Sequence, residues 1–277
     1  MKILIPSLDT IHTRNIGACL KSCDFMQTAL WDVSRKSLID AFDEINPDVV
    51  FLHENQLDLS FDIVAKQDNF KYFLICSSMP SRISKAPSAV ITGSQFLHNF
   101  KPEHNAVALG PAANVSQIHA GSSRPEMATD ALVITGGFPM TEDIMQMISF
   151  LCSSYKTRIV GAHPVPFPNY LGAVDIFERA DLIASAKVLV DFGSYDSMDA
   201  KYLKTASVFM PENVVDLQSS LDRLLSKRKV RKQLQKKEYE EIIKNGTYYH
   251  RCASLFDLIN EKEISKKILK AFEELIK

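Results

Sequence analysis

Several apolar, strand-like segments in the first half of the chain are followed by polar residues that could do chemistry. Asp9 and His12 stand in SLDTIHTRN, directly after the opening run KILIPS. An imidazole titrates near neutral pH and can take a proton from an acceptor hydroxyl, so His12 is a candidate general base. Asp9 could orient that imidazole or cap a helix. His53, which ends the run DVVFLH, and Glu54, which follows it, form a similar pair. For His12, His53 and Glu54 an exposed loop position without a catalytic role is the simpler interpretation, and for Asp9 it is helix capping.

The second half of the chain carries candidates for binding a phosphate or a sugar. Gly136 and Gly137 end the apolar run ALVITGG. Glycines there would let backbone N–H groups and the next helix approach a phosphate, although a plain tight turn explains the pair equally well. His163 follows the next apolar run, and Asp196 and Asp199 lie in the run GSYDSMD after a third. Helix capping by Asp196, with Asp199 in the first turn, is the structural alternative to a ligand role.

Strands of a parallel sheet would bring these polar residues together. The segments KILIPS, DVVFLH, KYFLICSS and SAVITGS are almost continuously apolar, as strands buried on both faces of such a sheet must be. Beyond residue 118, ALVITGG, TRIVGAHP, AKVLVDFG and ASVFMPE repeat the pattern. Ligands of open parallel sheets bind outside the carboxyl ends of the strands, where the candidates lie. The sequence therefore predicts an α/β fold with two Rossmann-like doubly wound domains facing each other across a cleft.

The predicted domain boundary lies in GPAANVSQIHAGSSRPEMATD, which is rich in Gly, Pro, Ser and Ala and has no periodicity. We expect a first domain at residues 1–117 and a second at residues 118–277. Residues 214–245 are predicted to form one long helix. Its basic run KRKVRKQLQKK either contacts phosphates or is a solvated face, and the solvated face is the simpler interpretation. The last segment, EISKKILKAFEELIK, has an apolar face and is expected to dock as the final helix of the second domain.

Composition limits the classes of function. Among 277 residues, 32 basic side chains stand against 33 acidic ones, so a net charge of -1 gives no whole-protein field that attracts nucleic acid or an anionic membrane. The five cysteines are scattered without the paired spacing of zinc or redox sites, which predicts reduced thiols in a cytoplasmic protein. The start is too short for a signal peptide, and no apolar run approaches the roughly 18 residues of a membrane span.

The order of four segments resembles a known family. VALGPAANVSQIHAGSSRPEMATDALVITGG is followed by NYLGAVDIFERADLIASAKVLVDFG, KYLKTASVFMPEN and GTYYHRCASLFDLI. This order resembles GT-B glycosyltransferases, particularly the CgeB-like branch of the glycosyl transferases group 1 superfamily. The residues that match short motifs of that branch are Pro111, Ala112, Gly136, Gly137, Thr247, Tyr248 and Arg251.

The resemblance implies a nucleotide-sugar donor in the second domain, with Gly136 and Gly137 beside its diphosphate. The family's acid pair, spaced E-x7-E, falls on Asp196 and Lys204. Asp196 keeps a carboxylate for the donor sugar, whereas the amine of Lys204 cannot accept hydrogen bonds from a ribose diol. Lys204 could instead meet a donor phosphate, Asp199 could be the ribose ligand, or the donor site could be altered or lost.

We therefore expect a glycosyltransferase that moves a sugar from a nucleotide-diphosphate sugar, with a UDP-sugar as the expected donor, to an acceptor hydroxyl. Helix N-termini and basic side chains can stabilise a departing diphosphate, so neither a metal ion nor a further cofactor is expected. The acceptor could be a glycan, a protein, a small metabolite or a modified DNA base. A catalytically silent nucleotide- or glycan-binding subunit is the alternative, and a sugar-nucleotide epimerase is a third interpretation. The expected catalytic residues are His12 and Asp9, and the expected donor-binding residues are Gly136, Gly137, His163, Asp196, Asp199 and Lys204.

Overall fold

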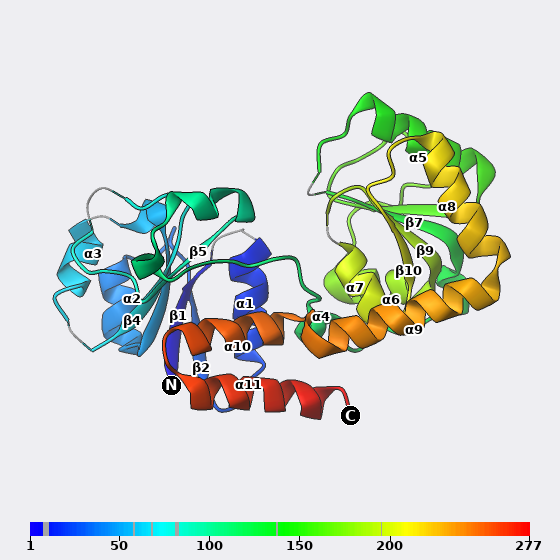
Figure 1. The fold of residues 1–277 in the computed structure, drawn as a ribbon. Helices are drawn as coiled ribbons and strands as arrows, with labels where there is room; N and C mark the ends of the chain where they lie inside the picture. Colours follow the sequence, from blue (N-terminus) through cyan, green and yellow to red (C-terminus); the bar gives the residue numbers. More distant parts are fainter. Residues whose placement is uncertain (8–10, 58, 68, 81–82, 137, 195) are drawn as a thin grey trace. The chain divides into compact units, whose positions relative to one another are not determined.

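The chain forms two compact units in a computed structural model, which describes residues 1–277 except 8–10, 58, 68, 81–82, 137 and 195 and omits the side chains of residues 11 and 12 (Figure 1). Unit 1 comprises Met1–Gly110 and Tyr248–Lys277, and unit 2 comprises Pro111–Thr247. Each unit is an α/β structure with its own parallel sheet. The α/β class predicted from the sequence is therefore confirmed.

Unit 1 is built on a six-stranded parallel sheet with the order β2-β1-β3-β4-β5-β6. The strands are β1 (Lys2–Pro6), β2 (Gln27–Trp31), β3 (Val49–His53), β4 (Lys71–Ile75), β5 (Ala89–Thr92) and β6 (Ala106–Ala108). The helices are α1 (Ile11–Lys21), α2 (Leu38–Ile45), α3 (Leu59–Val64), α10 (Tyr248–Leu258) and α11 (Lys262–Leu275), with 3-10 turns η1 (Glu54–Gln56), η2 (Ser94–Asn99) and η3 (Pro102–His104).

Both faces of the unit 1 sheet are buried. Leu52 packs with Phe42 of α2 on one face. On the other face Phe51 stacks on Phe73, whose ring meets Phe256 of α10 edge-on. Successive side chains of a strand point to opposite faces, so a sheet covered twice requires the continuous apolar runs seen in the sequence.

The C-terminal helices belong to unit 1, which differs from the predicted division at residues 117 and 118. Helix α10 lies against α1 (Figure 1), and the hydroxyls of Tyr249 and Ser22 are hydrogen-bonded at 2.7 Å. Lys71 in β4 donates to the Ile259 carbonyl oxygen at 2.8 Å and pairs with Glu261 at 2.6 Å. An apolar helix face dictates that the helix must pack somewhere, but these contacts between distant segments decide where.

Unit 2 is built on a four-stranded parallel sheet with the order β10-β9-β7-β8. The strands are β7 (Thr129–Thr135), β8 (Thr157–Gly161), β9 (Ala186–Asp191) and β10 (Ala206–Phe209). The helices are α4 (Val115–Ile118), α5 (Glu142–Ser154), α6 (Ile176–Ser185), α7 (Asp196–Tyr202), α8 (Val214–Ser226) and α9 (Arg228–Asn245), with the 3-10 turn η4 (Pro125–Met127). The run ALVITGG thus provides the first strand of a second sheet, as predicted.

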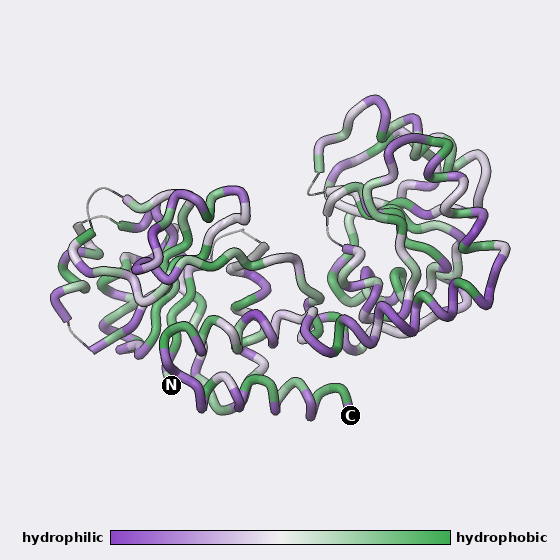
Figure 2. Tube along the Cα trace, viewed as in Figure 1, coloured by the Kyte–Doolittle hydropathy of each residue, from purple (hydrophilic) through white to green (hydrophobic). Residues whose placement is uncertain are grey.

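Helices cover both faces of the unit 2 sheet. Ile148 of α5 and Leu221 of α8 pack with Val133 on one face. Leu182 of α6 and Ala200 of α7 pack on the other face, against the alternate strand side chains. Figure 2 shows the strands as the most hydrophobic parts of the unit, which is the pattern of a doubly wound domain.

Two further features of the fold differ from the sequence prediction. Strands β2 and β6 were not expected, and they are the edges of the unit 1 sheet. The partly exposed β2 mixes polar with apolar residues, and β6 has only three residues, so neither leaves a long apolar run. The single helix predicted at residues 214–245 is two helices, α8 and α9. They meet at Lys227, whose φ of -102° and ψ of 75° lie outside the helical region.

Candidate functional site

The carboxyl ends of β7 and β9 form the topological switch point of unit 2. From β7 the chain passes to β8 on one side, then crosses back to β9 on the other side of β7. In open parallel sheets, ligands bind in the crevice outside such a point. Gly136, His163 and Asp196 follow β7, β8 and β9 respectively, so three of the predicted donor-binding residues lie at this edge.

Glycines shape the ends of β7 and β8. Gly136 has a φ of +132°, a backbone conformation that residues with a side chain rarely adopt. Gly161 has a φ of +134°, and a Cβ atom there would lie 1.9 Å from the Thr135 carbonyl oxygen. The two strand ends therefore approach each other more closely than any side chain at position 161 would allow. The other predicted glycine, Gly137, lies outside the described residues.

His163 is held at this edge through its backbone. The buried Thr135 hydroxyl donates a hydrogen bond to the His163 carbonyl oxygen at 2.7 Å. The residue itself is exposed, so its imidazole is accessible to a ligand. Its role in donor binding stays a prediction.

Asp191, the last residue of β9, organises the turn that leads into α7. Its Oδ1 accepts hydrogen bonds from the backbone N–H groups of Gly193 at 2.9 Å and Ser194 at 2.8 Å, and its Oδ2 accepts one from Ser197 at 2.9 Å. The residue is only 1% exposed. Its carboxylate therefore fixes the start of α7, and with it the positions of the acids in that helix. Sequence reasoning missed Asp191, although an acid that ends an apolar strand was a usable signal.

Arg179 of α6 joins the two acids of α7. Its Nη2 lies 2.9 Å from Asp196 Oδ1 and also pairs with Asp199. Asp199 Oδ1 accepts a hydrogen bond from the Asn114 backbone N–H at 2.9 Å, and the Ser194 hydroxyl donates to Asp196 Oδ2 at 2.6 Å. The structure thus brings the predicted ligands Asp196 and Asp199 together, but both carboxylates have partners within unit 2. Arg179 was missed because a basic residue on an amphipathic helix gives no sign of its partner.

Burial dominates the electrostatics of this cluster. It raises the pKa of Asp196 to about 6, although Arg179 opposes the shift. Burial also raises the pKa of Asp199 against the same opposition. Burial alone would lower the pKa of Arg179, but the carboxylates of Asp196 and Asp199 outweigh it and the net shift is upward. Two buried carboxylates, those of Asp196 and Asp199, share the guanidinium of Arg179, so their protonated forms are favoured relative to exposed acids.

We expect the Asp196→Asn variant to gain stability relative to the wild type as the pH rises. The pKa of Asp196 is raised from 3.8 in the unfolded chain to about 6 in the folded protein. The stability that the protonated Asp196 side chain gives the wild type is therefore fully present below the unfolded pKa and is lost as the pH rises through the folded pKa. A shift of about two units corresponds to roughly 3 kcal/mol. Urea unfolding of both proteins between pH 4 and pH 8 should show a stability difference that changes by about this amount.

Asp32→Asn is the control for the sign of this effect. Hydrogen bonds from Ser34 lower the pKa of the exposed Asp32 carboxyl, so its contribution is lost as the pH falls and the stability difference should run the opposite way. A stability difference between Asp196→Asn and the wild type that does not vary with pH would contradict the raised pKa.

Lys204 lies apart from the acidic cluster. It follows the last residue of α7 and precedes β10, so the length of α7 separates it from the carboxyl edge of the sheet. Its φ is +57°. Its ammonium lies 4.3 Å from the ring centroid of Tyr239 in α9, a cation–π contact. The expected counterpart of an acid pair is therefore at the opposite end of the helix from Asp196.

The predicted catalytic base belongs to unit 1. His12 lies in α1, the helix that follows β1, but its side chain and the whole of Asp9 are outside the described part of the chain. His53 follows β3 and has a local structural role, because its Nδ1 accepts a hydrogen bond from the Asn55 N–H at 3.4 Å. The roles of His12 and Asp9 stay predictions.

The segment GTYYHR contains three of the residues that match motifs of the CgeB-like branch, and these residues make internal packing contacts. Thr247 and Tyr248 are buried, and Thr247 forms a β-bridge with Ala113. Arg251 Nε donates a hydrogen bond to the Gly110 carbonyl oxygen at 3.3 Å. These contacts give the segment a structural role.

Three further observations concern metals, membranes and thiols. In the described ranges, no group of three His, Cys, Asp or Glu side chains is arranged to hold a metal ion. Of the helices that these ranges contain, none combines the length and apolar character needed to cross a membrane. All five cysteines are free.

Known proteins resemble this chain in fold but not detectably in sequence. No protein-family model matches the chain, and no curated protein matches it. Sucrose-phosphate synthase from Thermosynechococcus elongatus superposes with a TM-score of 0.63 at 9% identity, covering 96% of this chain and 100% of that chain. A glycosyltransferase from Rickettsia africae ESF-5 has a TM-score of 0.62 at 12% identity, with coverages of 97% and 98%. The UDP co-structure of MnaA from S. aureus has a TM-score of 0.55 at 9% identity, with coverages of 94% and 97%.

At such low identities the likeness concerns the fold. Each unit is an α/β structure built on a parallel sheet, as the sequence predicted, and the likeness covers nearly the whole of the compared chains. This chain therefore has the GT-B fold.

Proposed function

We propose that this chain is a glycosyltransferase of the CgeB-like branch that transfers a sugar from a UDP-sugar to an acceptor hydroxyl. The observation that carries the proposal is the polar edge of unit 2, where Gly136, His163 and the acids of α7 follow the strands around the switch point. The GT-B fold supports it, because it is shared with a Rickettsia glycosyltransferase over nearly the full length of both chains. The neighbour from S. aureus was solved with UDP.

The donor would bind at the carboxyl edge of unit 2. Backbone N–H groups around Gly136 and Gly137 would approach the diphosphate, because no side chain at Gly136 obstructs it. His163 would contact the donor from the β8 side. Asp196 or Asp199 would accept hydrogen bonds from sugar or ribose hydroxyls while sharing its carboxylate with Arg179. Lys204 is left out of this proposed set because its ammonium contacts Tyr239.

The acceptor would bind to unit 1, with His12 as the base and Asp9 as its orienting partner. The acceptor oxygen would bond to the anomeric carbon as the bond from that carbon to the diphosphate oxygen breaks. The hydroxyl proton would pass to His12, and the negative charge would go to the diphosphate. Backbone N–H groups at the glycine turn would stabilise that charge, so the proposal requires no metal ion. We place the acceptor among glycans and modified DNA bases, and the reaction in the cytoplasm.

One observation favours a second candidate, a silent nucleotide- or glycan-binding subunit. Arg179 pairs with both Asp196 and Asp199, and Lys204 is at the far end of α7. If Arg179 held both carboxylates permanently, neither would be available to a ribose diol. Such a subunit would keep the GT-B fold without transfer activity.

Thermal unfolding with UDP, GDP, ADP, CMP and their sugar conjugates tests both candidates. A ligand at about 100 times its dissociation constant adds roughly 2.7 kcal/mol, so we expect uridine nucleotides to raise the Tm visibly. His163→Ala should reduce this increase, because the residue is exposed at the proposed donor edge. Asp130→Asn is the matched control, because Asp130 lies near the start of β7, at the opposite edge of the same sheet.

The outcomes distinguish the candidates. A raised Tm with release of UDP and a glycosylated product supports transfer. A raised Tm without any product supports the silent subunit, and an altered free sugar nucleotide indicates an epimerase. No change of Tm with any nucleotide would overturn the donor site.

A further inference from the structure

Helix α9 carries a positively charged surface in unit 2, apart from the buried acidic cluster. Residues 227–237 contain seven Lys and Arg residues and no acid, in a protein whose net charge is -1. Figure 2 shows α9 as hydrophilic along most of its length. Seven of the 32 basic residues of this protein therefore lie together in one short run at the start of α9.

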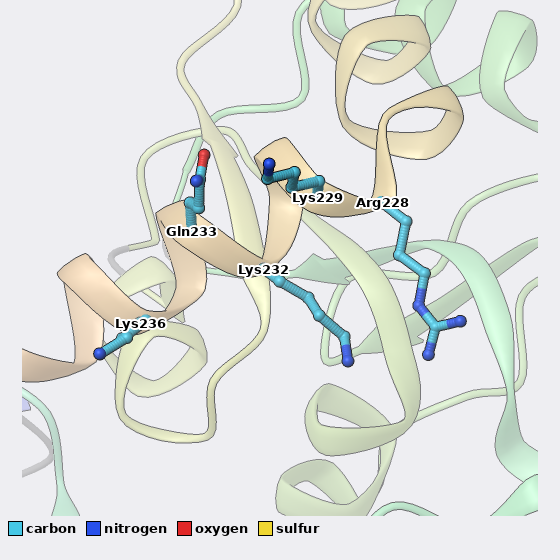
Figure 3. Close-up of a pocket in the computed structure, with 5 residues that line it drawn as sticks. All are labelled: Arg228, Lys229, Lys232, Gln233 and Lys236. Carbon is cyan, nitrogen blue, oxygen red and sulfur yellow. The ribbon is translucent and has the colours of Figure 1, made fainter.

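The cations form a regular row. Arg228, Lys232 and Lys236 recur every fourth residue, which places them on one helix face at intervals of about 6 Å along the axis. Together with Lys229 and Gln233 they line an open depression of about 590 Å³ (Figure 3). We call these five residues the α9 basic face.

Few acidic side chains of the protein pair with the cations of the α9 basic face. Arg231, which lies off this face, is used structurally and donates to the Leu224 carbonyl oxygen at 2.6 Å. Lys236 approaches Glu240 at 3.9 Å. Among the described residues, no acid lies within ion-pair distance of Arg228, Lys229 or Lys232. The first turn of α9 also lacks an acid, so these cations lie at the positive end of the helix dipole and do not stabilise the helix.

The α9 basic face is separate from the proposed donor edge. Helix α8 starts after β10, at the carboxyl edge of the sheet, and packs back along the sheet. Its last residue, Ser226, and the first residue of α9, Arg228, therefore lie toward the amino ends of the strands. A ligand on this face would not compete with a donor at Gly136 and Asp196.

We infer that the α9 basic face binds the sugar-phosphate backbone of double-stranded nucleic acid. Phosphate contacts from Lys and Arg supply essentially all of sequence-independent binding. A lipid surface is less suitable, because a membrane-surface helix needs an exposed apolar face, whereas Leu234 and Ile242 of α9 pack inside unit 2. Single strands require aromatic platforms for their bases, and Tyr239 of α9 is paired with Lys204. This inference does not depend on glycosyl transfer.

Fluorescence anisotropy of the full chain with a labelled 20-base-pair duplex tests the inference. The test variant combines Arg228→Gln, Lys232→Gln and Lys236→Gln. The matched control combines Lys262→Gln, Lys266→Gln and Lys270→Gln, which have the same four-residue spacing on the exposed side of α11. Each lost phosphate contact should reduce the slope of log K against log salt by about 0.9, so we expect the test variant to lose about 2.7 and the control variant almost none.

Three results would overturn the inference. They are no duplex binding by the wild type at 50 mM salt, an equal loss of slope in both variants, or wild-type binding to phosphatidylserine vesicles that is stronger than duplex binding and that the test variant abolishes. Circular dichroism shows whether the helices persist, and glutamine is a good helix former, so a folded test variant is expected.

Discussion

Replacing Arg179 by methionine is expected to reduce the free energy of unfolding by about 3–5 kcal/mol at pH 8, the cost of leaving a buried charge without its partner. Arg179 is the cation that pairs with both Asp196 and Asp199, and each acid is more than nine-tenths buried. Methionine keeps the helix propensity of α6 and much of the side-chain length. Urea unfolding measures the loss directly.

The dependence of this loss on pH identifies its electrostatic origin. Without the guanidinium, the pKa values of Asp196 and Asp199 would rise above their already raised values. Protonation would then neutralise the cluster, so the loss should shrink as the pH falls from 8 to 5. Adding Asp196→Asn and Asp199→Asn to the Arg179→Met variant should restore most of the stability at pH 8, because no buried charge is then left unpaired.

Arg223→Met, at an exposed position of α8, is the control for losing one guanidinium and should change stability by less than about 0.5 kcal/mol. Equal losses for Arg179→Met at pH 5 and pH 8 would contradict the electrostatic account. Such a result would indicate that Arg179 stabilises unit 2 by packing alone.

Replacing Gly161 by alanine is expected to cost more than about 4 kcal/mol, within the range of exceptional single substitutions. The added Cβ would lie 1.9 Å from the carbonyl oxygen of Thr135, at a φ of +134°. That oxygen belongs to β7, which is paired to β8 along its length, and it accepts a hydrogen bond from the Ala162 N–H at 3.0 Å. The backbone therefore cannot move away without breaking the sheet at the proposed donor edge.

The Gly193→Ala variant separates the cost of a positive φ from the cost of a steric overlap between the added Cβ atom and the backbone. Gly193 also has a positive φ, +112°, but a Cβ there would meet nothing within 4 Å. Its substitution should cost only the backbone strain, about 1–2 kcal/mol. Thermal and urea unfolding should show that the Gly161→Ala variant is much less stable than the Gly193→Ala variant. Similar losses of stability would contradict the close approach of β7 and β8.

The sequence predicted most of the fold because buried parallel strands leave a strong signal. Of the ten strands in the described part of the chain, the eight other than β2 and β6 coincide with apolar runs, since a strand covered on both faces needs apolar residues at every position. The edge strands could not be found in this way, because β2 is partly exposed and β6 has only three residues. For the candidate site, the loops after β7, β8 and β9 were predictable, since parallel strands place their carboxyl ends at one edge.

The sequence by itself therefore determined the α/β class, the second start at ALVITGG and the polar loops at the ends of the strands. Only the tertiary structure decided that α10 and α11 return to unit 1, that α8 and α9 are separate helices, and that Arg179 occupies both acids of α7. The physical reason is the range of the interactions. Burial periodicity is written into neighbouring residues, whereas the partner of a buried charge or of an apolar helix face is chosen by packing between segments far apart in the chain.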